Sequence, residues 1–376
     1  MSLGQDIGKP RVLVIENGIA VTGGVKSIAR GSMVLRDRFD FVFLLPSGSQ
    51  AIPYMRKKGF TVCEMPMREL KTSAVSLLLY GPILLLNSIR FTRLIRRHKI
   101  DLIHSNDFYN LIPCIYRMFG GQLAYVCHVR LMPSRFPKML VGLWCFFHKR
   151  YASSVIADSQ AVKKELNYLN NVVVIGDGLP LQEVEYFPAT SKIVLYPSNF
   201  TRGKGQDYAI RSFAHISKNY PEWKLRFMGS DLGLKKNADY KKELVVMAND
   251  LGIVNQVEWK HFSNDMPREY MDSSIVLNFS DSESFSLTCL EALFYGRPVI
   301  STNCGGPSEI IDHEESGLLV PTGDITSMHA AMDILMKDPD RRERMALMGR
   351  DRVRRRYGRE QTVHQLEDQY LAALGR

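Results

Sequence analysis

Residues 11–35 read Arg-Val-Leu-Val-Ile-Glu-Asn-Gly-Ile-Ala-Val-Thr-Gly-Gly-Val-Lys-Ser-Ile-Ala-Arg-Gly-Ser-Met-Val-Leu. The short apolar run at 11–15 is typical of a strand that is buried on both faces. A loop with three glycines follows, and residues 25–35 have a helix-like pattern. A strand, a glycine turn and a helix form the opening unit of a doubly wound sheet, so this stretch predicts an α/β fold.

The same alternation of strands and helices continues along the chain. Further strands are predicted at 41–45, 101–104, 123–128, 155–158 and 172–175, and then at 193–196, 223–228, 257–259, 275–279, 299–301 and 317–320. The pattern restarts after 183–190, which is typical of an interdomain linker. We therefore expect two Rossmann-like parallel-sheet domains, 1–186 and 187–361, with a cleft between the carboxyl ends of their strands. Residues 362–376 are expected to form a helix that packs back across the linker.

Composition fits this size and class of protein. The 376 residues are 45% hydrophobic and 23% charged, which suits two ordinary globular domains. The six cysteines form no Cys-x-x-Cys pair and show no zinc spacing, so we expect free thiols in a reducing compartment. Residues 1–4 lack the basic start and apolar core of a secretion signal, and we expect a cytoplasmic protein.

The net charge of +10 is unevenly distributed. Residues 1–186 contain 24 Lys and Arg against 13 Asp and Glu, whereas residues 187–376 contain 25 against 26. A basic first half predicts an anionic partner, such as a phospholipid surface or a phosphorylated acceptor, although a solvated face would explain the charge as well. Nucleic acid is not expected, because the basic residues are not interleaved with aromatic ones and no zinc spacing is present.

A second informative stretch, residues 280–306, reads Ser-Asp-Ser-Glu-Ser-Phe-Ser-Leu-Thr-Cys-Leu-Glu-Ala-Leu-Phe-Tyr-Gly-Arg-Pro-Val-Ile-Ser-Thr-Asn-Cys-Gly-Gly. A strand ending near 279 is followed by a loop with Glu283 and by a helix that begins near Ser286 and stops at Gly296. Glu291 then lies in the first turns of that helix. Backbone N–H groups at the helix start could meet anionic or hydroxyl groups of a ligand.

This stretch resembles the signature of the retaining GT-B glycosyltransferases that include glycogen synthases and sucrose synthases. The resemblance implies that Glu283 lies against the donor sugar and that Glu291 holds the ribose hydroxyls. The neighbouring positions expected to line the donor site are Ser284, Phe285, Ser286 and Leu287. For either glutamate alone, a solvated loop acid or a capping box between Thr288 and Glu291 would be the simpler interpretation.

Residues 196–205 place two cations in a glycine loop between a strand and a helix. Such a loop can hold a diphosphate, whose negative charge grows as it leaves the sugar. The resemblance implies that Lys204 stabilises this charge. The family usually has an arginine five residues earlier with the same role, where this chain has Asn199. Asn199 is expected at the donor, and Arg202 is expected to take the place of that arginine. A solvated loop arginine is the alternative.

The first half contributes two further candidates. Gly23 and Gly24 are at the position of the family's first glycine loop, which approaches the donor phosphates and the acceptor, although a tight turn alone would explain them. His128 ends a predicted strand, and the resemblance implies that it contacts the donor sugar. The family's acidic neighbour is replaced here by Val129-Arg130. A packed histidine is the alternative.

Together these residues predict transfer of a sugar from a nucleotide-sugar donor, bound mainly by 187–361, to a sugar-linked or lipid-linked acceptor, bound mainly by 1–186. The resemblance implies that the transfer proceeds with retention. No metal ion or other cofactor is expected, because Asp338-Pro339-Asp340 reads as a turn and helix cap. A nucleotide-sugar epimerase on the same fold and a binding protein without turnover are the alternatives. The donor base, the sugar, the acceptor and the oligomeric state are left open by the sequence.

Residues 74–89 contain no charged side chain and are followed by Arg90, Arg93, Arg96, Arg97 and Lys99. Sixteen residues interrupted by Gly-Pro at 81–82 are too few for a spanning helix. We expect either an interfacial helix pair on an anionic membrane, which would make the protein peripheral, or a buried helix followed by a solvated basic one.

Overall fold

The computed structural model describes residues 8–67, 74–180, 182–263 and 265–376, with only the backbone described at 74–82. The chain forms two compact units, and each is described by itself. Unit 1 comprises Met1–Gly178 and Arg359–Arg376, and unit 2 comprises Leu179–Gly358. The divisions expected from the sequence were at 186/187 and 361/362.

Unit 1 is a seven-stranded parallel sheet in the order β3-β2-β1-β4-β5-β6-β7. Its strands are β1 Arg11–Ile15, β2 Asp40–Pro46, β3 Thr61–Met65, β4 Leu102–Ser105, β5 Tyr125–Val129, β6 Ser154–Ala157 and β7 Val172–Val174. The order reverses between β1 and β4, whose register pairs Val12 with Leu102. Ligands of doubly wound sheets bind beyond the carboxyl ends of the strands at such a reversal.

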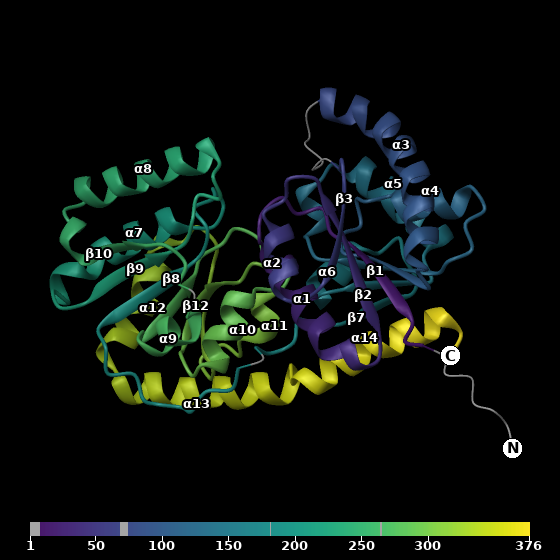
Figure 1. Cartoon of the computed structure of the whole chain (residues 1–376). Coiled ribbons are helices and arrows are strands. Elements are labelled where there is room, and N and C mark those ends of the chain that lie inside the picture. The colour runs from purple at the N-terminus through teal and green to yellow at the C-terminus, as the bar shows by residue number, and fades with distance from the viewer. Residues whose placement is uncertain (1–7, 68–73, 181, 264) are drawn as a thin grey trace, which may run out of the picture. The chain divides into compact units, whose positions relative to one another are not determined.

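Helices cover both faces of this sheet (Figure 1). The helices are α1 Gly23–Val34, α2 Ala51–Lys57, α3 Ala74–His98, α4 Ile112–Met118, α5 Lys138–Tyr151, α6 Gln160–Glu165 and α14 Arg359–Leu374. Alternate residues of β1 divide the core: Leu13 faces the layer of α3 to α6, and Val14 faces the layer of α1, α2 and α14. The last helix of the chain therefore completes the first unit.

Unit 2 has a six-stranded parallel sheet in the order β10-β9-β8-β11-β12-β13. Its strands are β8 Ile193–Pro197, β9 Lys224–Met228, β10 Val257–Lys260, β11 Ile275–Asn278, β12 Val299–Thr302 and β13 Gly317–Val320. Its helices are α7 Gln206–Ile216, α8 Lys235–Asp250, α9 Met266–Met271, α10 Leu287–Phe294, α11 Pro307–Ile310, α12 Ile325–Lys337 and α13 Pro339–Arg356. Here the order reverses between β8 and β11, which precede the loops with Lys204 and Glu283.

The predicted α/β fold with two parallel sheets is confirmed. The sequence did not predict β3, an edge strand whose side chains are mostly half-buried or exposed, so it lacks the apolar run of the central strands. The expected interruption at 81–82 was wrong, because α3 is one helix of 25 residues. Among the described residues, none of the helices combines the length and the apolar character needed to cross a bilayer.

Candidate functional site

Glu283 lies in the loop that follows β11, and backbone hydrogen bonds hold this loop in place. Glu283 N donates to Cys304 O at 3.1 Å, and Gly306 N donates to Glu283 O at 3.0 Å. A Cβ on Gly306 would stand 2.3 Å from Phe285 O, so only glycine allows this close approach. The loop after β11 is therefore fixed against the loop after β12, at the carboxyl edge of the sheet.

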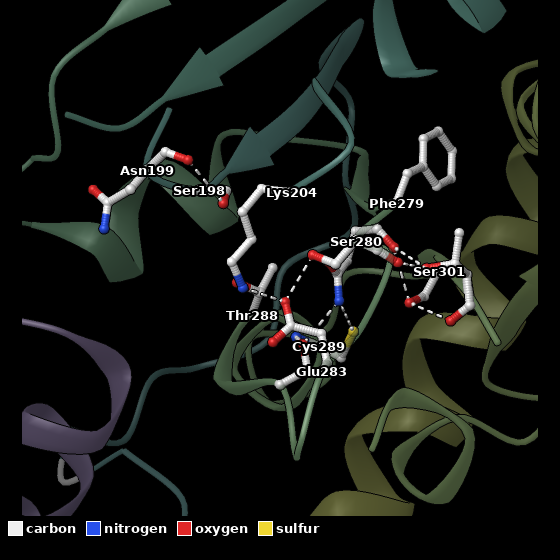
Figure 2. Close-up of polar contacts among 12 residues, drawn as sticks. Ser198, Asn199, Lys204, Phe279, Ser280, Glu283, Thr288, Cys289 and Ser301 are labelled. Atoms are coloured by element: carbon white, nitrogen blue, oxygen red, sulfur yellow. Dashed lines mark hydrogen bonds and ion pairs between the residues drawn. The ribbon is translucent and has the colours of Figure 1, made fainter. Parts of the chain in front are cut away.

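Lys204 comes from the loop after β8 and meets Glu283 directly. Its Nζ lies 2.7 Å from Glu283 Oε1, and the side chains are 32% and 18% exposed. Figure 2 shows the two side chains pointing toward one another, with Ser280 beside them. Ser280 Oγ is 2.7 Å from the same carboxylate oxygen. The structure thus brings together two of the residues expected to be catalytic, although 79 positions separate them.

A buried tyrosine hydroxyl joins the two loops. Tyr196, on β8, donates to Lys204 O and accepts a hydrogen bond from Phe279 N at 2.8 Å. Burial raises the pKa of Tyr196 well above its usual value, so the hydroxyl keeps the proton that it donates. Gly205 has φ of 74°, and a Cβ there would stand 2.0 Å from Phe279 O. The backbone around Lys204 is therefore held against the end of β11.

The start of α10 differs from the capping box considered for Thr288 and Glu291. Ser286 is the N-cap, and its Oγ accepts from Cys289 N at 3.3 Å. Ser286 has φ of 92°, a strained conformation for a residue other than glycine. Thr288 Oγ1 instead donates to Pro197 O at 3.2 Å. The capping-box alternative for Glu291 is wrong, and its carboxylate accepts from Tyr270 OH at 3.5 Å.

The remaining predicted donor positions of this stretch differ in exposure. Phe285 is 3% exposed and packs edge-on against Tyr357, with ring centroids 5.4 Å apart. Leu287 is partly buried against the same core, and Ser284 is also half-buried. The side chain of Phe285 is therefore part of the core. Because α10 begins at Leu287, its first-turn N–H groups lie beside the loop with Glu283.

Two predicted residues of the β8 loop are engaged elsewhere. The Arg202 guanidinium pairs with Glu243 on α8 and stands 4.8 Å from the ring centroid of Tyr240. Asn199 Oδ1 accepts from Ser230 Oγ at 3.1 Å, and Figure 2 shows its side chain directed away from Lys204. The structure does not bring Arg202 or Asn199 to the Lys204–Glu283 pair.

In unit 1, His128 lies on β5 and is 2% exposed. Its Nδ1 accepts from Arg130 Nη2 at 3.2 Å, and its ring centroid is 5.6 Å from that of His104. His128 Nε2 has no hydrogen-bond partner within the described part of the chain. Burial, the Arg130 charge and His104 lower the pKa of His128 well below its usual value, so its imidazole is neutral.

Arg130 is the centre of a polar cluster that the sequence did not predict. Its Nη1 donates to Asp177 Oδ1 at 2.5 Å and to Ser27 Oγ at 3.0 Å, and its Nε donates to Asn106 Oδ1 at 2.6 Å. Asn106 Nδ2 in turn donates to Glu16. Burial raises the pKa of Glu16. One sequence pattern could have predicted this cluster: polar residues directly follow several strands of this sheet, and parallel strands end at the same edge.

The expected glycine loop is the first turn of a helix. Gly23 and Gly24 begin α1, which Thr22 caps by accepting from Val25 N. A Cβ on Gly24 would lie 3.4 Å from Arg130 Cδ and 3.8 Å from Asn106 Nδ2. Gly24 thus leaves space beside the polar cluster, in the same unit as His128.

The acidic pair at Asp338 and Asp340 has the structural role that the sequence predicted. Asp338 caps α13 by accepting from Arg341 N at 2.8 Å, and Pro339 opens the helix. Throughout the residues that the structure describes, no group of three or more His, Cys, Asp or Glu side chains is arranged to hold a metal ion.

Comparison with known proteins agrees with this division into units. The family model described as glycosyl transferases group 1 matches residues 179–352, and the model described as glycosyltransferase family 4 matches residues 34–183. An uncharacterized glycosyltransferase of Haemophilus influenzae is 27% identical over 173 residues, which is 46% of this chain and 47% of that protein. The lipopolysaccharide core biosynthesis glycosyltransferase LpsD of Rhizobium meliloti is 25% identical over 211 residues, 54% of this chain and 58% of LpsD.

These matches span about half the length of the two relatives. Among solved structures, Anabaena HepE in complex with UDP and glucose superposes with a TM-score of 0.80 at 20% identity, covering 95% of this chain and 98% of HepE. That likeness shows the GT-B fold. The two family models match residues 34–183 and 179–352, so most of the chain is similar in sequence to family 4 and group 1 glycosyltransferases.

Proposed function

We propose that the chain is a retaining, metal-independent glycosyltransferase that uses a nucleoside diphosphate sugar. The observation that carries the proposal is the Lys204–Glu283 pair at 2.7 Å, built by two loops at the carboxyl edge of the unit 2 sheet. It puts a cation and an acid at the place where doubly wound sheets bind ligands. Relatives such as LpsD act in lipopolysaccharide synthesis, and we propose an acceptor of the cell envelope or an extracellular polysaccharide.

Each proposed role follows from the chemistry of transfer. The bond between the sugar C1 and the diphosphate oxygen breaks, the acceptor oxygen bonds to C1 from the same face, and the acceptor proton goes to the departing diphosphate. Lys204 and the first turn of α10 stabilise the charge that grows on the diphosphate. Glu283 orients the sugar, and Glu291 accepts hydrogen bonds from the ribose. This chemistry needs positioning and charge stabilisation, without a carboxylate nucleophile.

The deciding experiment follows the anomeric proton of donor and product by NMR. HepE was solved with UDP, so UDP-sugars are tested first, followed by GDP-sugars and ADP-sugars. An α-linked donor is expected to give an α-linked product in the presence of EDTA. Inversion, or activity that is lost in EDTA and restored by Mg²⁺ or Mn²⁺, would overturn the proposed mechanism. An epimerised donor would identify the alternative enzyme, and binding without turnover would identify a binding protein.

We also propose that unit 1 docks on an anionic membrane through α3. Leu85, Leu86 and Ile89 are 49%, 59% and 58% exposed, and they share one side of the helix with the exposed Arg90, Arg93, Arg96 and Arg97. The opposite side packs in the core through Phe91 and Ile95. Apolar side chains beside arginines match the acyl and headgroup layers of anionic phospholipid.

A further inference from the structure

We propose that Arg130 is a positioning residue that fixes His128 as a neutral imidazole with its proton on Nε2, ready to donate to a substrate oxygen. The inference starts from the direction of one hydrogen bond. A guanidinium can only donate, so the contact of 3.2 Å between Arg130 Nη2 and His128 Nδ1 requires a lone pair on Nδ1. A neutral imidazole with a lone pair on Nδ1 carries its proton on Nε2.

The guanidinium is in turn held by partners on several segments. Its side chain is 8% exposed, and it donates to Asn106 Oδ1, Ser27 Oγ and Asp177 Oδ1 at 2.5 to 3.0 Å. Asn106 is oriented at the same time, because its amide nitrogen donates to Glu16. Moving Arg130 away from His128 would break these bonds in a buried place, where unpaired polar groups are costly.

The Nε2 end of the His128 imidazole has no partner among the described residues. His128 Nε2 is buried and finds no acceptor in the described residues, although buried polar groups are normally paired. The ring of His104 lies beside it; His104 Nδ1 is within 2.7 Å of Tyr370 OH on α14, and His104 Nε2, like His128 Nε2, has no partner in the described residues. An unused N–H donor at the carboxyl side of a doubly wound sheet suits an oxygen of a bound substrate, such as a sugar hydroxyl.

Other titratable groups near His128 bear on its charge. The buried groups that interact electrostatically with Arg130 are Glu16 after β1, Asp107 after β4, Asp158 after β6 and Asp177 after β7, in addition to His104 and Tyr370. Burial raises the pKa of Asp107 well above its usual value and lowers the pKa of His104 to about 3. Arg130 is the cation that directly contacts His128, so protonation of Nδ1 would set two positive charges side by side.

The tautomer can be measured without any substrate, which separates this proposal from the transferase function on which the role of His128 rests. The chain has nine histidines, and ¹⁵N-histidine labelling with His128→Gln assigns the His128 signals. In the parent we expect an unprotonated Nδ1 and a protonated Nε2 at all values between about pH 5.5 and 8. A protonated Nδ1, or a titration within that range, would overturn the proposal.

Variants of Arg130 test whether it fixes the tautomer of His128. Arg130→Met leaves the buried Asp177 carboxylate without its cation, which could prevent folding. The double variant Arg130→Met/Asp177→Asn avoids this unpaired charge. We expect it to show exchange between the two tautomers and a His128 that titrates in the accessible range. Asp177→Asn alone is the matched control, since it keeps Arg130, and it should retain the parental tautomer. If the double variant also keeps the parental, non-titrating His128, Arg130 has no positioning role.

Turnover measurements then test whether the His128 Nε2–H donates a hydrogen bond during the reaction. His128→Leu removes the N–H, and kcat should fall by about tenfold, the loss expected for one neutral hydrogen bond. His128→Gln retains an amide N–H and should recover part of that loss. Equal activity of the Leu and Gln variants would show that no N–H is donated at this position.

Discussion

Replacing Lys204 by Ala separates the stability of the ion pair from its proposed work on the diphosphate. The Lys204 and Glu283 side chains are 32% and 18% exposed, so solvent screens their attraction. Loss of such a pair costs about 1 kcal/mol of unfolding free energy or less, which is about 2–4 °C in Tm for a domain of this size. Glu283 keeps its contact of 2.7 Å with Ser280 Oγ, so the variant leaves the carboxylate with a partner.

The effect of Lys204→Ala on turnover should be much larger. A cation that stabilises the charge of the departing diphosphate contributes about 2.7 kcal/mol to the barrier, or about 100-fold in kcat. Release of nucleoside diphosphate is the measurement, with Tm recorded on the same samples. We expect kcat to fall by about two orders of magnitude while Tm changes by only a few degrees.

Lys192→Ala is the matched control. Lys192 lies just before the start of β8, whereas Lys204 lies in the loop after its end. Lys192 pairs with Glu222 at 3.8 Å, and both side chains are about half exposed. It should lose a similar small amount of stability and keep the parental kcat. If Lys204→Ala loses no more activity than Lys192→Ala, the proposed role of Lys204 is refuted.

Glu291→Ala should weaken UDP binding in calorimetry by about 1.5–3 kcal/mol, because a charged acceptor for the ribose is lost; unchanged affinity would leave Glu291 a structural role, such as its contact with Tyr270. The parent should sediment with anionic vesicles at low salt and leave them as salt rises, whereas Gln at the four arginines of α3 should abolish sedimentation; binding that survives would exclude α3 as the docking site. Burial lowers the pKa of His148 to about 4, so stability present above pH 6.5 is lost as the pH falls toward 4. His148→Gln should flatten the dependence of Tm on pH, and an unchanged slope would contradict the buried neutral imidazole.

The sequence predicted most of the fold because central parallel strands are buried on both faces. Such strands read as short apolar runs, and β1 and β13 begin and end as expected. The side chains of the edge strand β3 are mostly half-buried or exposed, so its sequence contains no such run. The helix α3 continues through the Gly-Pro pair at 81–82, which local propensity alone would interpret as a break.

The candidate site was predictable in its residues and less so in its contacts. Both Glu283 and Lys204 were expected, but no rule of spacing shows that a carboxylate and an ammonium 79 positions apart will meet. Arg202 was expected at the diphosphate, but in the structure it pairs with Glu243. A long side chain on a loop can pair with any acidic residue near it in space, and the sequence does not show which one that is. The partners of Arg130 come from segments up to 103 positions away, so its cluster left no local signal.

The return of α14 to unit 1 bears on how the chain folds as it is synthesised. Leu366 and Tyr370 belong to the same core as Val12 and Val14, the alternate residues of the first strand. Until α14 has been synthesised and has left the ribosome, part of that core stays uncovered, while all of unit 2 already exists and can fold as a continuous segment. Unit 2 is therefore an insertion that is synthesised before unit 1 is complete, and unit 1 depends on a helix that is translated after all of unit 2.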